Sequence, residues 1–408
     1  MKGKESGILC FLVSLSLALF SFGCATSPKY HVQGSLAGQE ISTTTDSELS
    51  KYYLEHYLKS DRVSREYDEK IGQALIIWDK RAIDSASLGQ LTEHFSPDFA
   101  TLYFVSRIYG DPVNRRAQEA FRSHLATIRN EGADEMFRIG ERVGPYLIAF
   151  VPGYAYKRDP WTGADFGRQR RLMSQAGIRN VLIETDELGT VEENAKIVAN
   201  EILRLKEQHH KIILVSTSKG GAEVALAIGK LLPSQQLSHV KAWISIGGLL
   251  RGTPSADQAL QWPTSWLVRA AFFFKGLRGE VVEDLSTKRR REVFAQLEFP
   301  EHILMLQYVG VPLSGQIAEY VEGRYNDLKQ LGPNDGLTLL ADELVEGGVV
   351  ITDIGLDHYY LDPDIDLKTF ALASVVLDLL EGRNATPCRA PSADPPTVYS
   401  YDREPCRD

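Results

Sequence analysis

The chain has 408 residues, of which 43% are hydrophobic, and its formal net charge is −9. This length is sufficient for one large domain with an accessory region, or for two domains. The acidic balance argues against a nucleic-acid-binding protein, because binding to phosphates requires a basic surface.

The N-terminal residues 1–24 are typical of an export signal. Two lysines within the first four residues are followed by an apolar run over residues 8–22, which is short for a bilayer span. The run ends in Gly23-Cys24-Ala25, which resembles the small-residue–cysteine pair of a bacterial lipoprotein signal. We therefore expect lipidation at Cys24 and a location in the bacterial cell envelope, at the outer membrane or in the periplasm. An uncleaved anchor and ordinary cleavage near Ala25 are the alternatives.

The next two segments are predicted to lie outside the main domain. Residues 25–45 are polar and rich in Ser, Thr and Gly, which is typical of a tether. Residues 46–140 carry apolar side chains at helical spacing, and Ser96 and Asp111 each precede a proline, as helix caps often do. We expect this part to be a helical accessory region that packs on the main domain.

Residues 141–385 are predicted to form an α/β domain. Short runs that are apolar throughout alternate with helical stretches, a pattern typical of a mostly parallel sheet with helices on both faces. The six runs read PYLIAFVPG, IRNVLIETD, KIILVSTS, HVKAWISIGG, HILMLQYVGVP and GGVVITDIG.

The stretch ILVSTSKGGAEVALAIGKL (213–231) predicts a sharp turn between a strand and a helix. Ser218 lies at the apex of this turn, and small residues, Ser216 and Gly220, lie two positions before and after it, where the backbone leaves no room for larger ones. A serine at this position is exposed over the carboxyl edge of the sheet, so Ser218 is the predicted nucleophile. The alternative is a serine-rich helix cap.

A nucleophilic serine needs a base and an acid that orients the base. His358 follows the last predicted strand, and Asp335 lies in the turn LGPNDGLTLL. The order Ser218, Asp335, His358 is that of one hydrolase fold, so these residues are the predicted triad. Alternative acids are Asp327, Asp342, Asp353 and Asp357, and weaker alternative bases are His209, His210 and His302.

Two backbone N–H groups are predicted to bind the oxyanion. One belongs to Lys219, at the amino end of the helix after Ser218. The other belongs to Gly153 or Tyr154, in the segment AFVPGYAY after the first strand of the domain. The alternative for this segment is a plain turn that ends a strand.

Together these segments resemble the α/β-hydrolase family, particularly its lipases and esterases. The resembling stretches are FVPGY, VSTSKGG, GPNDGL and GLDH, within residues 145–381. The resemblance implies acyl transfer, in which Ser218 attacks an ester carbonyl, His358 shuttles the proton, Asp335 orients His358 and water releases the acyl group.

Residues 252–298 stand where this family places a cap or lid. The insert holds an aromatic stretch, WPTSWLVRAAFFFKGL, and a basic cluster at residues 288–291. These features suit an acyl pocket, lipid or anionic headgroups. The alternative is a buried helix followed by a solvated basic one.

The tail, residues 386–408, is rich in proline and holds Cys388 and Cys406. These cysteines are predicted to form a disulfide in an oxidising compartment, with two unpaired thiols as the alternative.

The sequence thus predicts an exported serine hydrolase of acyl or lipid esters, held at a membrane by an N-terminal lipid anchor. It shows no metal motif or phosphate-binding loop, and we expect no cofactor. A catalytically inactive envelope binding protein on the same fold is one alternative. A serine peptidase or acyltransferase with the same triad is another.

Overall fold

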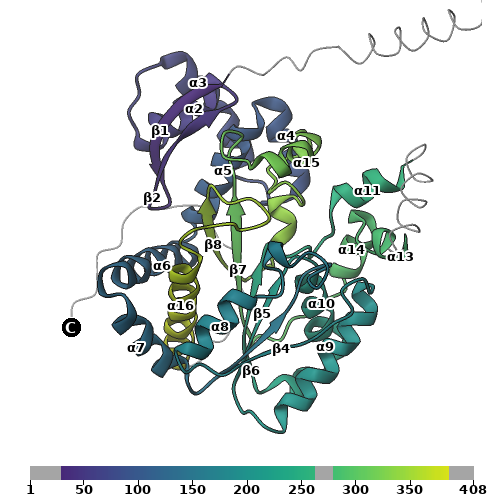
Figure 1. Ribbon diagram of the computed structural model, residues 1–408. Coiled ribbons are helices and arrows are strands. Elements are labelled where there is room, and N and C mark those ends of the chain that lie inside the picture. The colour runs from purple at the N-terminus through teal and green to yellow at the C-terminus, as the bar shows by residue number, and fades with distance from the viewer. Residues whose placement is uncertain (1–28, 262–278, 386–408) are drawn as a thin grey trace, which may run out of the picture.

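The computed structural model describes residues 29–261 and 279–385 (Figure 1). Its centre is a six-stranded parallel sheet with the strand order β4-β3-β5-β6-β7-β8. Each strand falls within one of the six predicted apolar runs, which confirms that prediction. The strands are β3 (Leu147–Val151), β4 (Asn180–Leu182), β5 (Ile212–Thr217), β6 (Val240–Ile246), β7 (Leu304–Val311) and β8 (Val349–Ile354).

Helices cover both faces of the sheet (Figure 1). Phe150 and Val215 face a core that includes α8 (Gly167–Gln175) and α16 (Ile365–Ala385), whereas Ala149 and Leu214 face α9 (Val191–Lys206) and α10 (Lys219–Leu226). The strand order reverses between β3 and β5, because the chain runs from β3 outward to β4 and then returns. In open α/β sheets, ligands bind at the carboxyl ends of the strands at such a reversal.

The predicted tether is wrong for most of its length, because residues 30–45 form a hairpin. Strands β1 (Tyr30–Leu36) and β2 (Gln39–Thr45) pair in antiparallel fashion around a two-residue turn at Ala37-Gly38, where both φ angles are positive. Val32 and Ile41 are buried in a core shared with the following helices. These apolar residues are too few and too widely spaced among polar ones to reveal the strands in the sequence.

The accessory region is helical, as predicted, but it ends earlier than expected. Its helices pack with the hairpin against β7 and β8, in a core that contains Phe99 and Val311. The side chains of Ser96 and Asp111 cap helices at the predicted positions. The helices are α2 (Glu48–Glu55), α3 (Arg65–Trp78), α4 (Ser85–His94) and α5 (Pro97–Gly110).

Helices α6 (Pro112–Glu131) and α7 (Ala133–Val143) belong to the α/β domain, although they were assigned to the accessory region. Phe121 and Leu125 lie in the same core as α16 and the sheet, and Figure 1 shows α6 and α7 beside α16. The boundary at residue 140 is therefore wrong. The amphipathic pattern of a helix predicts that it packs, but not which neighbour it packs on.

Three amide side chains cover the open edge of the sheet at β8. The backbone N–H groups of residues 350, 352 and 354 donate to the side-chain oxygens of Asn114, Gln118 and Gln39, each at 2.9 Å. An uncovered edge strand can pair with another chain, so these contacts protect the edge. Because Gln39 belongs to β2, they also fasten the hairpin to the sheet.

The insert between β6 and β7 is helical where it is described. It contains α11 (Pro254–Leu260), α13 (Gly279–Asp284) and α14 (Thr287–Phe294), and α15 (Glu319–Leu328) follows β7. The predicted aromatic stretch of the insert, residues 262–277, lies entirely outside the described residues. The signal segment with Cys24 and the tail with Cys388 and Cys406 also lie outside them.

Candidate active site

Ser218 lies at the turn between β5 and α10 with an unusual backbone conformation. Its φ of 53° and ψ of −126° fall in a region that non-glycine residues rarely adopt. The N–H of Ser218 donates to the carbonyl of Ile246 at 3.1 Å, and its carbonyl accepts from the N–H groups of Gly221 and Leu249, each at 3.0 Å. These bonds hold the strained turn, so its geometry is the one predicted from the sequence.

The small residues two positions before and after Ser218 both lie against close neighbours. A Cβ atom on Gly220 would lie 2.4 Å from the carbonyl oxygen of Pro152, closer than real Cβ contacts come. Ser216 is fully buried, and its hydroxyl accepts a hydrogen bond from the indole N–H of Trp243 at 2.8 Å. A serine at this flank therefore has a specific partner, which the sequence did not reveal.

The side chains of His358, Asp335 and Ser218 form one connected hydrogen-bond chain. His358 Nε2 lies 3.1 Å from Ser218 Oγ, and His358 Nδ1 lies 2.5 Å from Asp335 Oδ2. A carboxylate can only accept, so Nδ1 carries the proton and Nε2 is left to accept from the serine hydroxyl. The structure thus brings together the three side chains that the sequence singled out.

Asp335 is held from three further sides. Its Oδ1 accepts from the backbone N–H groups of Leu337 and Thr338, each at 2.8 Å. Its backbone carbonyl accepts from the N–H of His358 at 2.9 Å. The carboxyl group is fully buried, so these bonds replace water as partners for its charge.

A second carboxyl group, Glu343, lies buried near Asp335. Burial, followed by the nearby charges of Asp335 and Asp342, raises the pKa of Glu343 well above its ordinary value. This shift favours the protonated, uncharged form of Glu343. Sequence reasoning missed this residue, because nothing in the segment LADEL signals that it folds behind the Asn-Asp-Gly turn.

The alternative acids and bases lie elsewhere or have other partners. His209, His210 and His302 precede β5 and β7, at the amino-terminal edge of the sheet, whereas Ser218 lies at the opposite edge. Asp327 is exposed on α15. The other carboxylates are paired: Asp342 with Arg291 at 2.8 Å, Asp353 with Lys368 at 2.5 Å, and Asp357 with the N–H of Tyr359 at 3.0 Å.

Among the predicted oxyanion donors, the backbone N–H of Gly153 already has a hydrogen-bond partner. This N–H donates to the carbonyl of Ala164 at 3.0 Å, so of the two predicted alternatives, Gly153 and Tyr154, the N–H of Gly153 is already hydrogen-bonded. Gly153 instead allows close packing, because a Cβ atom there would lie 3.3 Å from the Cβ of Ser218. The N–H groups of Tyr154 and Lys219 remain as candidates.

The side chain of Lys219 is held by a buried hydrogen bond and a buried ion pair. It is fully buried, and its ammonium group donates to the carbonyl of Gly189 at 2.7 Å and pairs with Glu223 at 3.0 Å. Asn194 donates to the same carboxylate at 2.7 Å. These contacts tie the first turn of α10 to the loop after β4 and so fix the position of the residue that follows Ser218.

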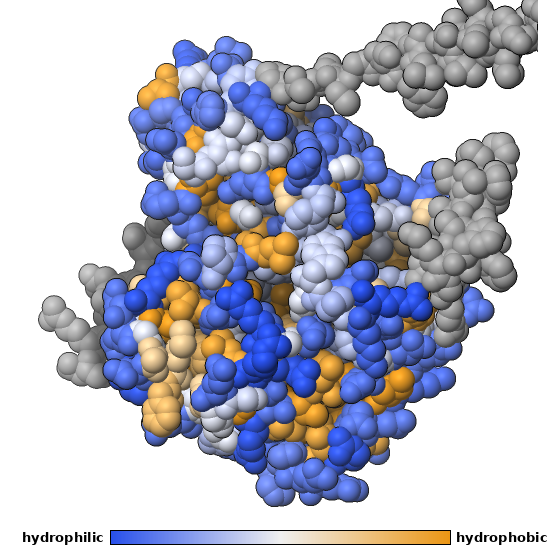
Figure 2. Space-filling view, in the orientation of Figure 1, coloured by the Kyte–Doolittle hydropathy of each residue, from blue (hydrophilic) through white to orange (hydrophobic). Residues whose placement is uncertain are grey.

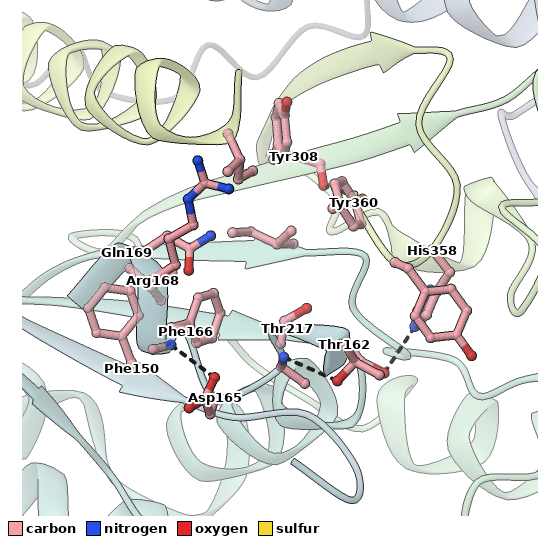
Figure 3. Close-up of a pocket in the computed structure, with 18 of the residues that line it drawn as sticks. Phe150, Thr162, Asp165, Phe166, Arg168, Gln169, Thr217, Tyr308, His358 and Tyr360 are labelled. Atoms are coloured by element: carbon pink, nitrogen blue, oxygen red, sulfur yellow. Dashed lines mark hydrogen bonds between the residues drawn. The ribbon is translucent and has the colours of Figure 1, made fainter. Parts of the chain in front are cut away.

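A cavity of about 890 Å³ opens beside Ser218 and His358. Its walls are mostly apolar side chains, and it continues between the sheet and helices α8 and α16. In Figure 3, Phe150 and Phe166 lie at one end of the site and His358 lies at the other. Figure 2 shows hydrophobic side chains within a hollow near the centre of the molecule, bordered by hydrophilic ones.

Three aromatic rings cluster beside the catalytic candidates. Trp161 stacks on Tyr359, with ring centroids 5.3 Å apart, and Tyr320 contacts both rings edge-on. Trp161 and Tyr359 also line the cavity next to His358. Trp161 and Tyr359 therefore form part of the cavity wall beside His358, and Tyr320 packs against both of them.

The three arginines of the basic cluster in the insert form ion pairs within the protein, whereas Lys288 is exposed. That the cluster meets anionic headgroups stays a prediction. Arg290 is only 2% exposed and pairs with both Asp284 and Glu192. Burial, followed by the hydrogen bond with Glu192, raises the pKa of Asp284 to about 7. The neighbouring arginines also form ion pairs, Arg289 with Glu192 at 3.2 Å and Arg291 with Asp342 at 2.8 Å.

The fold and the site together define an α/β-hydrolase-type architecture. A parallel sheet carries helices on both faces, a serine at the strained turn after β5, and an acid and a histidine after the later strands β7 and β8. In residues 29–261 and 279–385, no cluster of three or more His, Cys, Asp or Glu side chains could hold a metal ion.

Comparison with known proteins gives matches in structure only. No protein-family model matches the chain, and no curated protein matches its sequence. A metagenomic carboxyl esterase, MGS0156, superposes with a TM-score of 0.48 at 17% identity, covering 59% of this chain and 76% of that one. The mature lipase BlEst2 of Bacillus licheniformis superposes with a TM-score of 0.46 at 18% identity, covering 58% and 92%. At this level of similarity, nothing about the activity of the present chain follows.

Proposed function

We propose that the protein is a serine hydrolase that cleaves carboxylic esters of acyl or lipid type. The observation that carries this proposal is the chain of contacts from Ser218 Oγ through the ring of His358 to Asp335, with distances of 3.1 and 2.5 Å. This arrangement makes a serine hydroxyl nucleophilic at neutral pH. The mostly apolar cavity at the same serine favours an acyl group as the part that is bound.

In the proposed reaction, Ser218 Oγ attacks the ester carbonyl carbon while His358 Nε2 takes the hydroxyl proton. The bond to the alkoxy oxygen then breaks, and the leaving alcohol receives that proton from His358. Water next attacks the acyl-enzyme and gives a proton to His358, which returns it to Ser218 as the carboxylic acid leaves. Asp335 keeps the proton on Nδ1 throughout and stabilises the imidazolium.

The oxyanion formed in both steps needs hydrogen-bond donors. We assign this role to the backbone N–H of Lys219, at the amino end of α10, and to that of Tyr154. Each such donor contributes about 3 kcal/mol to transition-state stabilisation. The buried ion pair of Lys219 with Glu223 supports the assignment, because it fixes the backbone that carries the first donor.

A fluorophosphonate probe tests the nucleophile. It should label the wild type and the control Ser255→Ala, whose side chain lines the same cavity, and it should spare Ser218→Ala. Equal labelling of Ser218→Ala and wild type would reject Ser218 as the nucleophile. An inactive binding protein would leave all three unlabelled. Product analysis with ester, amide and added alcohol would then separate a hydrolase from a peptidase or an acyltransferase.

We further propose that the protein is exported and held in the bacterial envelope through a lipid on Cys24. The support is the basic, apolar and small-residue pattern of the first 24 residues. Within the described ranges, the helices are all too short or too polar to cross a membrane. Metabolic labelling with a fatty acid should mark the wild type and not Cys24→Ser, and labelling of both would refute the anchor.

A further inference from the structure

The cavity extends far below the catalytic serine, along one face of the sheet. On β5 it is lined by Thr217, Val215 and Ile213, which are alternate residues and so point to the same side. On β3 it is lined in the same way by Phe150 and Ile148. The cavity therefore follows the strands from their carboxyl ends, where Ser218 lies, towards their amino ends.

Helix α16 forms the opposite wall with one of its faces. Its lining residues Thr369, Leu372 and Val376 recur at intervals of three and four, so they lie along one stripe of the helix. Lys368, in the first turn, pairs with Asp353 at the carboxyl end of β8, which places the start of the helix near the level of Ser218. With a rise of about 1.5 Å per residue, Val376 then lies about 12 Å deeper.

A space of this size is not ordinary packing. Protein interiors are filled to crystal-like density, and empty volume in a core is destabilising. The volume of about 890 Å³ instead falls within the range of about 300–1,000 Å³ that is typical of ligand pockets. The shape and the continuity with Ser218 both indicate a ligand that enters at the active site.

Two of the charged side chains at the wall form ion pairs within the protein. Lys368 pairs with Asp353 and Asp362, and Arg168 on α8 pairs with Asp366 on α16 at 2.7 Å. Below Ser218 the walls formed by β3, β5 and α16 are chiefly aliphatic and aromatic, whereas α8 also contributes Arg168, Gln169 and Arg171. Such a wall favours a hydrocarbon chain over a polar one.

The depth of the cavity sets the length of that chain. From Ser218 to Ile213 the strand covers about 16 Å. Carbon–carbon bonds of about 1.5 Å at tetrahedral angles advance about 1.25 Å per carbon in an extended chain, so about 12 carbons fit.

We propose that the substrate carries a linear acyl chain of about 12 carbons, which inserts tail-first between the sheet and helices α8 and α16. This inference rests on the proposed ester hydrolase function and names its substrate class. The carbonyl group stays at Ser218, the middle of the chain passes Leu372, and the methyl end reaches Ile213 and Val376.

The first test measures kcat/KM for p-nitrophenyl esters from C4 to C16. The wild type should gain up to about fourfold per added methylene until about C12, and then lose activity. Val376→Phe should lower the C12 rate at least tenfold and shift the optimum to shorter chains, and Leu372→Phe should shift it further. The unfolding midpoint of each variant in urea checks that it folds.

Leu379→Phe is the matched control, because it makes the same change on the same helix but does not line the cavity. Its chain-length profile should equal that of the wild type. A wild-type profile that is flat from C4 to C12, or a profile that Val376→Phe leaves unchanged, would overturn the proposal.

A binding measurement separates this inference from the proposed function. Ser218→Ala should bind dodecanoate in calorimetric titration, and adding Val376→Phe should weaken binding at least tenfold. If dodecanoate binds in this way but no ester is cleaved, the cavity assignment stands and the hydrolase proposal fails. If short esters are cleaved but dodecanoate does not bind, the hydrolase proposal stands and the cavity assignment fails.

Discussion

Replacing Asp335 by Asn tests whether the buried carboxylate sets the protonation of His358. In the wild type, Oδ1 of Asp335 accepts two backbone N–H groups, from Leu337 and Thr338, while Oδ2 faces His358 Nδ1. The amide oxygen of Asn will take the position of Oδ1, because two donors already point at it. Its NH₂ group then faces Nδ1 and can only donate, so the imidazole must carry its proton on Nε2. In that form His358 cannot accept the proton of Ser218.

The size of the effect follows from the cost of turning the amide around. The reversed orientation would present the oxygen to His358 but leave two buried N–H groups facing an NH₂ group. Each unmade bond costs about 1–3 kcal/mol, so the reversed form is disfavoured by about 2–6 kcal/mol. At about 1.4 kcal/mol per tenfold, kcat should fall by about 30-fold to 10⁴-fold.

The assay is kcat for p-nitrophenyl butyrate, with the unfolding midpoint in urea as a check on folding. Asp357→Asn is the control, because it makes the same chemical change next to His358, while the wild-type carboxylate accepts backbone N–H groups and not the ring of His358. The control should stay within tenfold of the wild type. If folded Asp335→Asn also stays within tenfold, the carboxylate does not set the tautomer and the reasoning fails.

Three further predictions concern the supporting structure. Gly220→Ala should abolish measurable turnover and lower the melting temperature, because its Cβ would lie 2.4 Å from a carbonyl oxygen, and normal activity would show that the turn can relax. Gln118→Ala should lower the free energy of unfolding by about 1–3 kcal/mol, since it uncovers a buried N–H of β8; an unchanged urea midpoint would contradict this. Burial, followed by the charge of Asp46, raises the pKa of Asp98 from 3.8 to about 7, so the folded protein holds a proton that the unfolded chain has lost. The free energy of unfolding should therefore fall by up to about 1.4 kcal/mol per pH unit as the pH rises from about 4 to about 7. Urea titrations at several pH values should show a shallower fall for Asp46→Asn. Equal pH dependence of the variant and the wild type would refute the coupling.

The strands and the candidate triad could be predicted because their signals are local. A strand buried on both faces is apolar throughout, and the six runs stood out for that reason. Ser218 was found because a sharp turn between a strand and a helix restricts the residues on either side of it. Asp335 and His358 followed from chain order and from their positions after later strands, which meet Ser218 at the same edge of a parallel sheet.

The hairpin and the boundary of the accessory region could not be predicted, because they depend on contacts between distant segments. Gln39 reads as one more polar residue in a polar stretch, and its partner on β8 lies more than 300 residues away. Gln118 likewise lies on a helix whose apolar stripe would suit either domain. Only the fold brings these amides to the exposed edge of β8.

The cavity beside Ser218 could not be predicted from the sequence either. Its lining residues on β5 alternate, and those on α16 recur at helical spacing, which are also the patterns of a closely packed core. Such patterns predict that a surface is buried, but they do not predict whether neighbouring side chains fill the space beside it. Whether a cavity remains depends on the volumes of side chains on the sheet and on two separate helices. A sequence can thus indicate which side chains carry out a reaction, whereas the chain length that the reaction accepts is set by a gap between elements that only the assembled structure contains.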